Sequence, residues 1–243
     1  QSLPSISRPS LQIIILLLYL VLSRSATCPS GTPLSINMSK FSASGLSINQ
    51  LFTMKSGSST GNLYFYGQAY SAIKNAIVIK TTPDSSVIWA KSYDKNGYMR
   101  TFDIDHSETY IYFVHMDTFC PLHKLSTSDG AVVASKRISA LIITFTYPDV
   151  SFYSASNTLF FSGKDSTSKT VVCSTDVNVL ATAQCVNYSG LKEAKGILPL
   201  SSSDLLVIAD EPTTPFPITI ARVSFGSSPT IVWRKMMPCP TSC

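Results

Sequence analysis

An internal repeat constrains the fold of this 243-residue chain more than any other feature of its sequence. Four units follow one another, each made of two pairs of short apolar runs, and their first pairs begin near residues 51, 101, 150 and 196. A landmark aspartate is followed five positions later by tryptophan or alanine, and its position advances by 45, 47 and 52 residues. The landmark recurs as Asp84/Trp89, Asp129/Ala134, Asp176/Ala181 and, with serine in place of aspartate, Ser228/Trp233. A period of 40–50 residues is typical of propeller blades.

The apolar runs are short, and they end in Ser, Asp, Asn, Gly or Pro, which predicts strands joined by turns. Some runs, such as "LYFYG" and "LLVIAD", are continuously apolar, which suits a strand buried on both faces. We expect these to be the innermost strands. A four-stranded antiparallel sheet cannot bury two faces alone, but sheets stacked around an axis do so. The sequence therefore predicts an all-β fold, a β-propeller of four-stranded antiparallel blades.

About four such blades fit in this chain, either as a whole ring or as part of a larger one. Immunoglobulin-like sandwiches are the alternative, although they would not explain the near-constant step between units. The expected organisation is a signal peptide (1–25), a lead-in segment (26–47), a propeller region (48–238) and a cysteine-containing end (239–243). The expected blades within the propeller region are 48–98, 99–140, 147–190 and 194–237.

The N-terminal segment predicts secretion. Arg8 precedes the apolar run "LQIIILLLYLVL" and small residues follow it, with cleavage expected near Ser25. The run is shorter than the roughly 20 residues of a membrane span. We therefore expect a secreted or cell-surface protein without a membrane span in its mature part. A buried core strand or a retained anchor helix is the alternative.

The cysteines agree with an oxidising compartment, because all six follow the expected cleavage point. Cys173 and Cys185 are twelve residues apart on strands expected to pair, so we predict a disulfide between them. A clasp between the chain ends, from Cys28 to Cys239 or Cys243, is a further possibility that would leave Cys120. A zinc site is the competing interpretation, but the sequence has no CxxC spacing.

Two sequons predict attached glycans at Asn37 and Asn187. The net charge of +5 is spread along the chain without a basic stripe, so nucleic acid is not an expected partner.

Two stretches resemble the quinoprotein-like and YVTN-like propeller repeats. "TFDIDHSETYIYFV" is similar to their first hairpin and "LSTSDGAVVASK" to their second. "TTPDSSVIW" also resembles an Asp-box, the structural turn of sialidase-like propellers, with Ser86 where glycine is usual. The resemblance covers roughly residues 48–237 and is a generic repeat pattern. It implies that Trp89 and Trp233 correspond to the family's docking tryptophans.

Structural roles are expected for the landmarks, with Asp84, Asp129 and Asp176 capping turns and the two tryptophans wedged between blades.

Chemistry-bearing clusters are sparse in the sequence. Asp103 and Asp105 would share one face of a strand, so they are weak candidates for metal ligands, against the alternative of a solvated strand end. Asp210 and Glu211 are expected in a solvated loop, and the histidines near Cys120 on the surface; these are His115 and His123. Motifs of hydrolases, metalloproteases and phosphate-binding loops are missing from the sequence, as are the adjacent cysteines of quinone-dependent enzymes. We expect no catalytic residues and no cofactor.

The sequence favours a secreted structural or interaction protein, a propeller-type module of a cell-surface or extracellular filament assembly. Other protein chains are the expected partners, including copies of the same chain that pair through exposed blade edges. The alternatives are a fragment of an extracellular dehydrogenase or glycosidase, and a receptor ectodomain that binds a glycan or another ligand.

Overall fold

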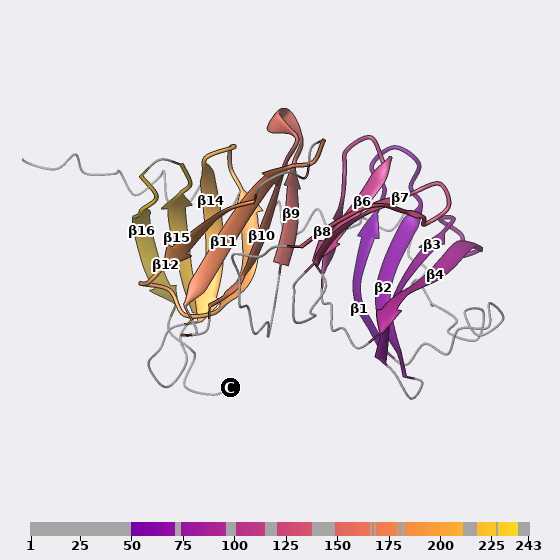
Figure 1. Ribbon diagram of the computed structural model, residues 1–243, viewed down its shortest axis with the longest axis horizontal. Coiled ribbons are helices and arrows are strands. Elements are labelled where there is room, and N and C mark those ends of the chain that lie inside the picture. The colour runs from indigo at the N-terminus through magenta and orange to yellow at the C-terminus, as the bar shows by residue number, and fades with distance from the viewer. Residues whose placement is uncertain are drawn as a thin grey trace, which may run out of the picture. The chain divides into compact units, whose positions relative to one another are not determined.

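The computed structural model shows an all-β fold made of four-stranded antiparallel blades, as in a β-propeller (Figure 1). The residues that it describes are 50–70, 74–95, 101–114, 121–137, 149–165, 167, 169–178, 180, 183–210, 218–226 and 228–237. These parts of the chain contain sixteen strands and one short 3-10 helix, η1 (Ser154–Ser156), and no α-helix. The predicted fold class is confirmed.

Each blade consists of four strands that are consecutive in the sequence. Blade 1 contains β1 (Gln50–Ser56), β2 (Leu63–Tyr70), β3 (Lys74–Thr81) and β4 (Val87–Lys95). Blade 2 contains β5 (Phe102–Ile104), β6 (Tyr110–Val114), β7 (Pro121–Ser126) and β8 (Val132–Arg137). Blade 3 contains β9 (Asp149–Tyr153), β10 (Thr158–Lys164), β11 (Thr170–Asp176) and β12 (Gln184–Tyr188). Blade 4 contains β13 (Ala194–Pro199), β14 (Asp204–Asp210), β15 (Ile218–Ser224) and β16 (Ile231–Met237).

Within every blade the strands hydrogen-bond in chain order, so that each sheet is an antiparallel meander. An immunoglobulin-like sandwich would instead divide the strands of one domain between two facing sheets. That alternative does not describe the molecule. Each sheet lies within the residue range expected for its repeat unit.

The position of the continuously apolar strands corrects one expectation. β2, β10 and β14 are the second strands of their sheets, and the first strands lie next to one another instead: β5 contacts β1 and β9, and β13 contacts β9. The first strands, not the apolar ones, are therefore innermost. A second strand has strands on both sides, and in β2 and β10 neighbouring side chains also cover both faces, whereas one face of β14 is exposed at Ile208.

Three apolar clusters join the blades in pairs. One contains Tyr64 and Trp89 of blade 1 with Phe102 and Phe113 of blade 2. The others join blade 2 to blade 3 and blade 3 to blade 4. Because buried apolar area is the main favourable term in folding, these junctions hold the repeat together.

Several predictions concern residues outside the described parts of the chain. These are the signal peptide (1–25), the lead-in segment (26–47) and the cysteine-containing end (239–243). Among the described residues, no helix is long and apolar enough to cross a membrane.

Candidate functional site

The landmark aspartates lie in the last turn of their blades. In blade 2, Oδ1 of Asp129 accepts a hydrogen bond from the N–H of Ala131 (3.0 Å), and in blade 3, Oδ1 of Asp176 accepts one from Asn178 (2.7 Å). Asp84 instead accepts hydroxyl donors within its turn, from Thr82 and Ser86. All three carboxylates thus satisfy polar groups of a tight turn, which is a structural role.

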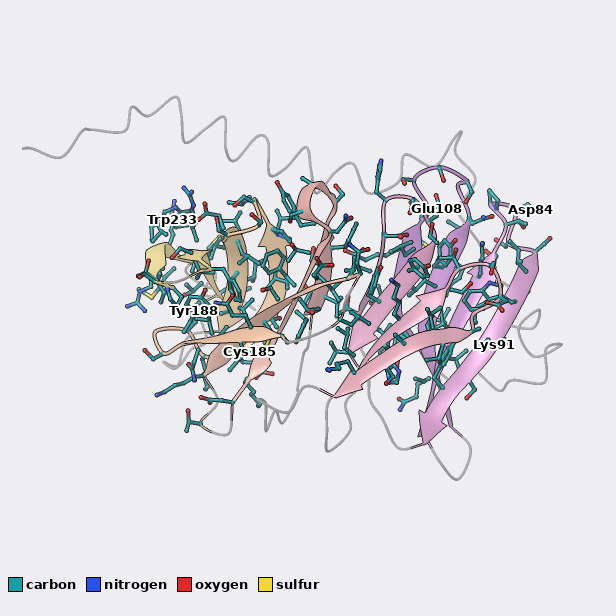
Figure 2. The ribbon with its side chains drawn as sticks, turned by 45° about the horizontal axis from the view of Figure 1, so that its top comes forward. Asp84, Lys91, Glu108, Cys185, Tyr188 and Trp233 are labelled. Atoms are coloured by element: carbon teal, nitrogen blue, oxygen red, sulfur yellow. A yellow bond between two sulfur atoms is a disulfide. The ribbon has the colours of Figure 1, made fainter. Side chains whose placement is uncertain are left out.

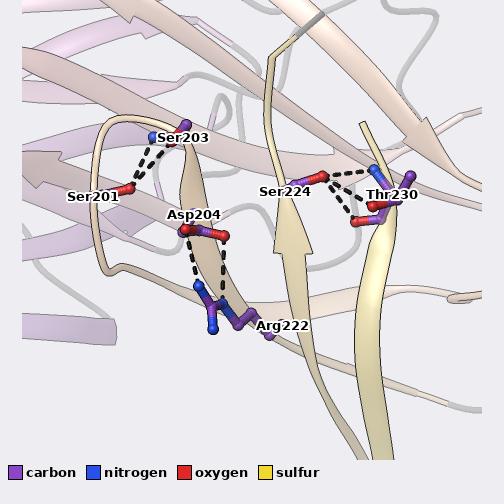
Figure 3. Close-up of polar contacts among 6 residues, drawn as sticks. All are labelled: Ser201, Ser203, Asp204, Arg222, Ser224 and Thr230. Carbon is purple, nitrogen blue, oxygen red and sulfur yellow. Dashed lines mark hydrogen bonds and ion pairs between the residues drawn. The ribbon is translucent and has the colours of Figure 1, made fainter. Parts of the chain in front are cut away.

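The fourth turn, where serine replaces the landmark aspartate, is closed differently (Figure 3). The main-chain N–H of Thr230 donates to Oγ of Ser224 (2.9 Å), and the two hydroxyl oxygens lie 3.1 Å apart. A hydroxyl on the strand therefore replaces the carboxylate of the turn.

Asp103, a candidate metal ligand from the sequence, ties three blades together. Its Oδ1 accepts from Nζ of Lys55 in blade 1 (2.7 Å) and from its neighbour Ile104 (2.9 Å). Its Oδ2 accepts from the main-chain N–H of Phe152 in blade 3 (2.7 Å). Both oxygens are used by protein donors.

Asp149 repeats this arrangement one blade later. Its Oδ1 accepts from the N–H of Val150 (2.9 Å) and its Oδ2 from the N–H of Ile197 in blade 4 (2.7 Å). Burial raises the pKa of this carboxyl, although the N–H of Ile197 and the charge of Lys55 act in the opposite direction. Asp103 and Asp149 are thus equivalent ties between first strands.

The carboxylate of Asp105 turns away from Asp103 and caps its own hairpin. Its Oδ1 accepts from the N–H groups of Thr109 (2.7 Å) and Tyr110 (3.0 Å), and its Oδ2 from the hydroxyl of Ser107 (3.0 Å). The described residues contain no cluster of three or more His, Cys, Asp or Glu side chains placed to hold a metal ion.

Glu108, in the same hairpin, reaches across to the β1–β2 turn of blade 1 (Figure 2). The backbone and hydroxyl groups of Ser59 and Thr60 donate to its carboxylate. Burial by itself would raise the pKa of Glu108, but these donors hold its pKa below the usual value. The carboxylate also occupies the space that a side chain at Gly57 would need.

Two adjoining hollows surround the β5–β6 turn. The smaller, about 220 Å³, lies over Lys55, Gly57, Asp103 and Glu108. The larger, about 390 Å³, lies between blades 2 and 3, and its volume is within the range of small-molecule sites. The two hollows share four lining residues: Asp105, His106, Phe152 and Ser154.

A row of three paired residues on blade 1 makes its junction with blade 2. Tyr64, Lys80 and Trp89 lie opposite one another on β2, β3 and β4, and therefore share one face of the sheet. Nε1 of Trp89 (2.9 Å) and Nζ of Lys80 (3.0 Å) both donate to the carbonyl of Thr127 in blade 2. Trp89 is only 8% exposed, because blade 2 covers it.

The same positions recur on blade 2, where Tyr112, Lys124 and Ala134 form the row. Nζ of Lys124 donates to the carbonyl of Val177 in blade 3, again at 3.0 Å. A cation in the middle of the row therefore binds a carbonyl of the next blade's turn at both junctions.

Blade 4 carries the row at the same positions, and among the described residues no further blade packs against it. Leu206, Arg222 and Trp233 occupy the three positions, and Arg222 pairs with Asp204 of its own blade (3.0 Å), as Figure 3 shows. Trp233 is 45% exposed, so it is not wedged as expected from the sequence (Figure 2).

Other apolar side chains surround Trp233 on this side of the sheet. The strand register places five of them on one face, which we call the outer face of blade 4, and they are 41–48% exposed. The five are Leu198, Ile208, Ile218, Trp233 and Met237. The opposite face, with Leu205 and Val207, is buried against blade 3.

The remaining candidates of the sequence have these places. Cys173 and Cys185 form a disulfide between β11 and β12. Asn187 is exposed on β12, where its amide donates to Asp165. Asn37, Cys28, Cys120, Cys239 and Cys243 lie outside the described residues, as do His115 and Glu211.

Two expectations about exposure change. His123 is not a surface residue, since it is 6% exposed and its ring stacks on Phe113 at 4.8 Å, inside the sheet of blade 2. Asp210 lies at the end of β14, where it forms an ion pair with Lys195 (3.1 Å).

Known proteins resemble this chain in structure but not in sequence. No protein-family model matches the chain, and no curated protein matches its sequence. Among solved structures, a mutant of the Synechocystis apocarotenoid oxygenase is similar at 8% identity, over 72% of this chain and 46% of that one, with a TM-score of 0.47. An exo-β-1,3-galactanase from Clostridium thermocellum is similar at 12% identity, over 75% and 47% of the two chains, with a TM-score of 0.48. A GH43 β-1,3-galactosidase is similar at 11% identity, over 76% and 45%, with a TM-score of 0.47. The chain thus spans about half the length of the solved structures it matches.

Proposed function

We propose that this chain is a secreted interaction module that associates with a second copy of itself through the outer face of blade 4. The group of exposed apolar side chains on that face, which lie beside Arg222 and Lys235, is the observation that carries the proposal. Contiguous apolar patches on a soluble protein mark interaction sites. The row around Arg222 and Trp233 also repeats the residues that blade 1 uses against blade 2, so the face is built to pack against another blade.

We expect a second copy of this chain to cover the outer face of blade 4, because of which blade faces remain exposed. In blade 1, Phe65, Ile77 and Ile79 are 0–1% exposed, so most of the side away from blade 2 is covered, although Met54 beside Phe65 is 44% exposed. In the other copy, the matching exposed apolar face is again that of blade 4. Contact between two identical faces is isologous, and it closes a dimer with two-fold symmetry. A filament would require a second interface in addition.

The size of the face predicts a weak dimer. Four strands of six or seven residues measure roughly 20 by 23 Å, or about 450 Å² of sheet. Stable complexes bury about 800 Å² on each partner. We therefore expect reversible association in the micromolar range.

Sedimentation velocity of the mature protein, from micromolar to near-millimolar concentration, tests this proposal. Association should increase with concentration, and Trp233→Glu should weaken it by about 30-fold, the effect of losing a central interface residue. Val133→Glu is the matched control, because Val133 is 52% exposed on β8, outside blade 4. A monomer at every concentration, or an association that Trp233→Glu leaves unchanged, would contradict the proposal.

Secretion has separate support. The Cys173–Cys185 disulfide is compatible with an oxidising compartment, and the apolar run after Arg8 has the pattern of a signal peptide. Expression of the chain with residues 1–25 in place, in a eukaryotic secretory host, tests it. We expect the protein in the medium, beginning near residue 26; protein that stays in the cells with this segment attached would refute secretion.

A further inference from the structure

The larger hollow between blades 2 and 3 has a lining that the self-association does not use. It is formed by the β5–β6 turn, by Tyr110 and Tyr112 on β6, and by residues of blade 3. The landmark turn of blade 3 contributes Val177 and Asn178, and the segment after η1 contributes Asn157. Its composition decides which ligand chemistry fits.

The charged groups of this hollow are already satisfied by the protein. Nζ of Lys124 donates to the carbonyl of Val177 and lies 3.9 Å from the centre of the Tyr110 ring. The carboxylate of Asp105 accepts three hydrogen bonds from its own hairpin. Both side chains are also buried, at 9% exposure each, so neither offers an exposed counter-ion to a charged ligand.

The remaining polar side chains include two amides and one imidazole, and these three are exposed to solvent. Within the described residues, the side chains of Asn157, Asn178 and His106 carry no hydrogen bond, and all three are exposed. Each amide offers two donors and an acceptor. The backbone of Asn157 is held in the left-handed region (φ 50°), which fixes the base of its side chain at the end of η1.

Aromatic rings supply the apolar part of the lining. Phe152 stacks on Tyr112, with the ring centroids 6.0 Å apart and the planes nearly parallel, and it lines both hollows. Tyr110 packs beside Tyr112 at 6.5 Å. These contacts anchor the rings on the protein side, and the part-exposed surfaces of Phe152 and Tyr110 remain for a ligand.

We infer that this hollow is a binding site for a neutral sugar. A pyranose ring presents an apolar C–H face, which packs on aromatic rings, and several hydroxyls that both donate and accept. Amide and imidazole side chains pair with such hydroxyls without a net charge. The volume of about 390 Å³ is sufficient for one or two hexose units. This site lies on other blades than the proposed dimer face and is independent of it.

The probe is an array of neutral hexose oligosaccharides, followed by calorimetry of the disaccharide that binds best, with the mature chain. We expect millimolar to high-micromolar binding, as suits a shallow polar site. Asn178→Ala and Asn157→Ala should each weaken it about tenfold, because each removes two or more hydrogen bonds to the ligand. Tyr110→Phe should weaken it only about two- to threefold, since it keeps the ring.

Matched controls separate the hollow from the rest of the surface. Asn62→Ala and Trp233→Ala change an amide and an aromatic ring outside the hollow, and they should leave sugar binding unchanged. The exposed position of Asn157 and Asn178 means that their variants keep the fold, which circular dichroism verifies. Absence of binding across the array would overturn the inference. So would equal binding by the Asn157→Ala/Asn178→Ala variant, or tighter calorimetric binding of a nucleoside or a sulfated disaccharide measured beside the neutral one.

Discussion

A three-residue row occupies equivalent positions in blades 1 and 4, but the residues that cover it differ. In blade 1 the row of Tyr64, Lys80 and Trp89 lies under blade 2, and Trp89 is 8% exposed. In blade 4, within the described residues, no further blade lies over the row of Leu206, Arg222 and Trp233, and Trp233 is 45% exposed. The central cation shows the difference, because Lys80 binds a carbonyl of the next blade and Arg222 binds its own blade. A repeat therefore specifies a surface, and the neighbour decides whether that surface is a core or an interface.

Removing the tryptophan from each row should give the largest difference in the free energy of unfolding between variants of blades 1 and 4. Trp89→Ala deletes a buried ring and its hydrogen bond to Thr127, so we expect the free energy of unfolding to fall by about 3–5 kcal/mol. Trp233→Ala removes a half-exposed ring, so the monomer should lose less than about 1 kcal/mol. Urea denaturation at low protein concentration measures both. Similar losses for the two variants would mean that the outer face of blade 4 is covered within the monomer.

The burial of Trp89 and the exposure of Trp233 also mark the limit of prediction from sequence. The period of the repeat and the turn residues were sufficient to predict four sheets, because strand and turn propensities act locally. The two tryptophans are indistinguishable in the sequence, since their burial depends on which chain segment follows in space. The position of the apolar strands was wrong for a related reason. Continuous apolar character reports burial on both faces in β2 and β10, which are not innermost, whereas β14 is apolar with one exposed face.

The polar contacts that join the blades were partly predictable from the sequence. Asp149 was missed, although it lies 46 residues after Asp103, within the range of the repeat steps. That spacing was the available signal. Its partner, the backbone of Ile197, could not have been found, because backbone donors carry no sequence signature. The sequence offers no pattern that selects Asn157 and Asn178, which come together only where blade 3 folds beside blade 2.

Removal of the central cation from each row should lower the free energy of unfolding by less than removal of the tryptophan. Lys80→Met removes one of the two donors to the carbonyl of Thr127, and we expect a loss of about 1–2 kcal/mol, as for a hydrogen bond from a charged group. Arg222→Met removes an ion pair in which Arg222 is 41% exposed, so the loss should be below about 0.5 kcal/mol. Thermal unfolding in low and high salt distinguishes them. A greater effect of Arg222→Met would reverse the assignment of the two environments.

Tyrosines on the last strands of blades 1 and 3 extend the comparison to the face of blade 4 that lies against blade 3. The hydroxyl of Tyr93 on β4 donates to the carbonyl of Gly130 in blade 2 (2.6 Å), and that of Tyr188 on β12 donates to Ser224 in blade 4 (2.6 Å). Blade 4 is therefore tied on one side in the same manner as blade 2. Tyr93→Phe and Tyr188→Phe should each lower the free energy of unfolding by about 1 kcal/mol. Tyr153→Phe is a control, because no hydrogen bond of its hydroxyl occurs within the described residues. Unequal effects in urea denaturation would show that the two ties differ.

The response to alkaline pH should be the smallest effect, and it again separates blade 4 from the others. Burial raises the pKa of Tyr64 to about 12, and the pKa values of Tyr93, Tyr112 and Tyr188 are raised further for the same reason. A group with a raised pKa in the folded state contributes its full stability below the unfolded value, near 10, and loses it as the pH rises through the folded value. We therefore expect each of these tyrosines to lower stability by less than about 1 kcal/mol between pH 9 and 10.5.

Blade 4, residues 194–237, contains no tyrosine, so no tyrosine of its own ionises in this range. Tyr64→Phe keeps the buried ring and removes the ionisable hydroxyl, and should reduce the pH dependence of the unfolding midpoint. Phe65→Tyr is not a suitable control because Phe65 is fully buried, whereas Tyr153→Phe changes a part-exposed hydroxyl and should leave the pH dependence unchanged. If Tyr64→Phe kept the whole alkaline loss, ionisation at the junction of blades 1 and 2 would not be its source, and the two rows would differ in packing alone.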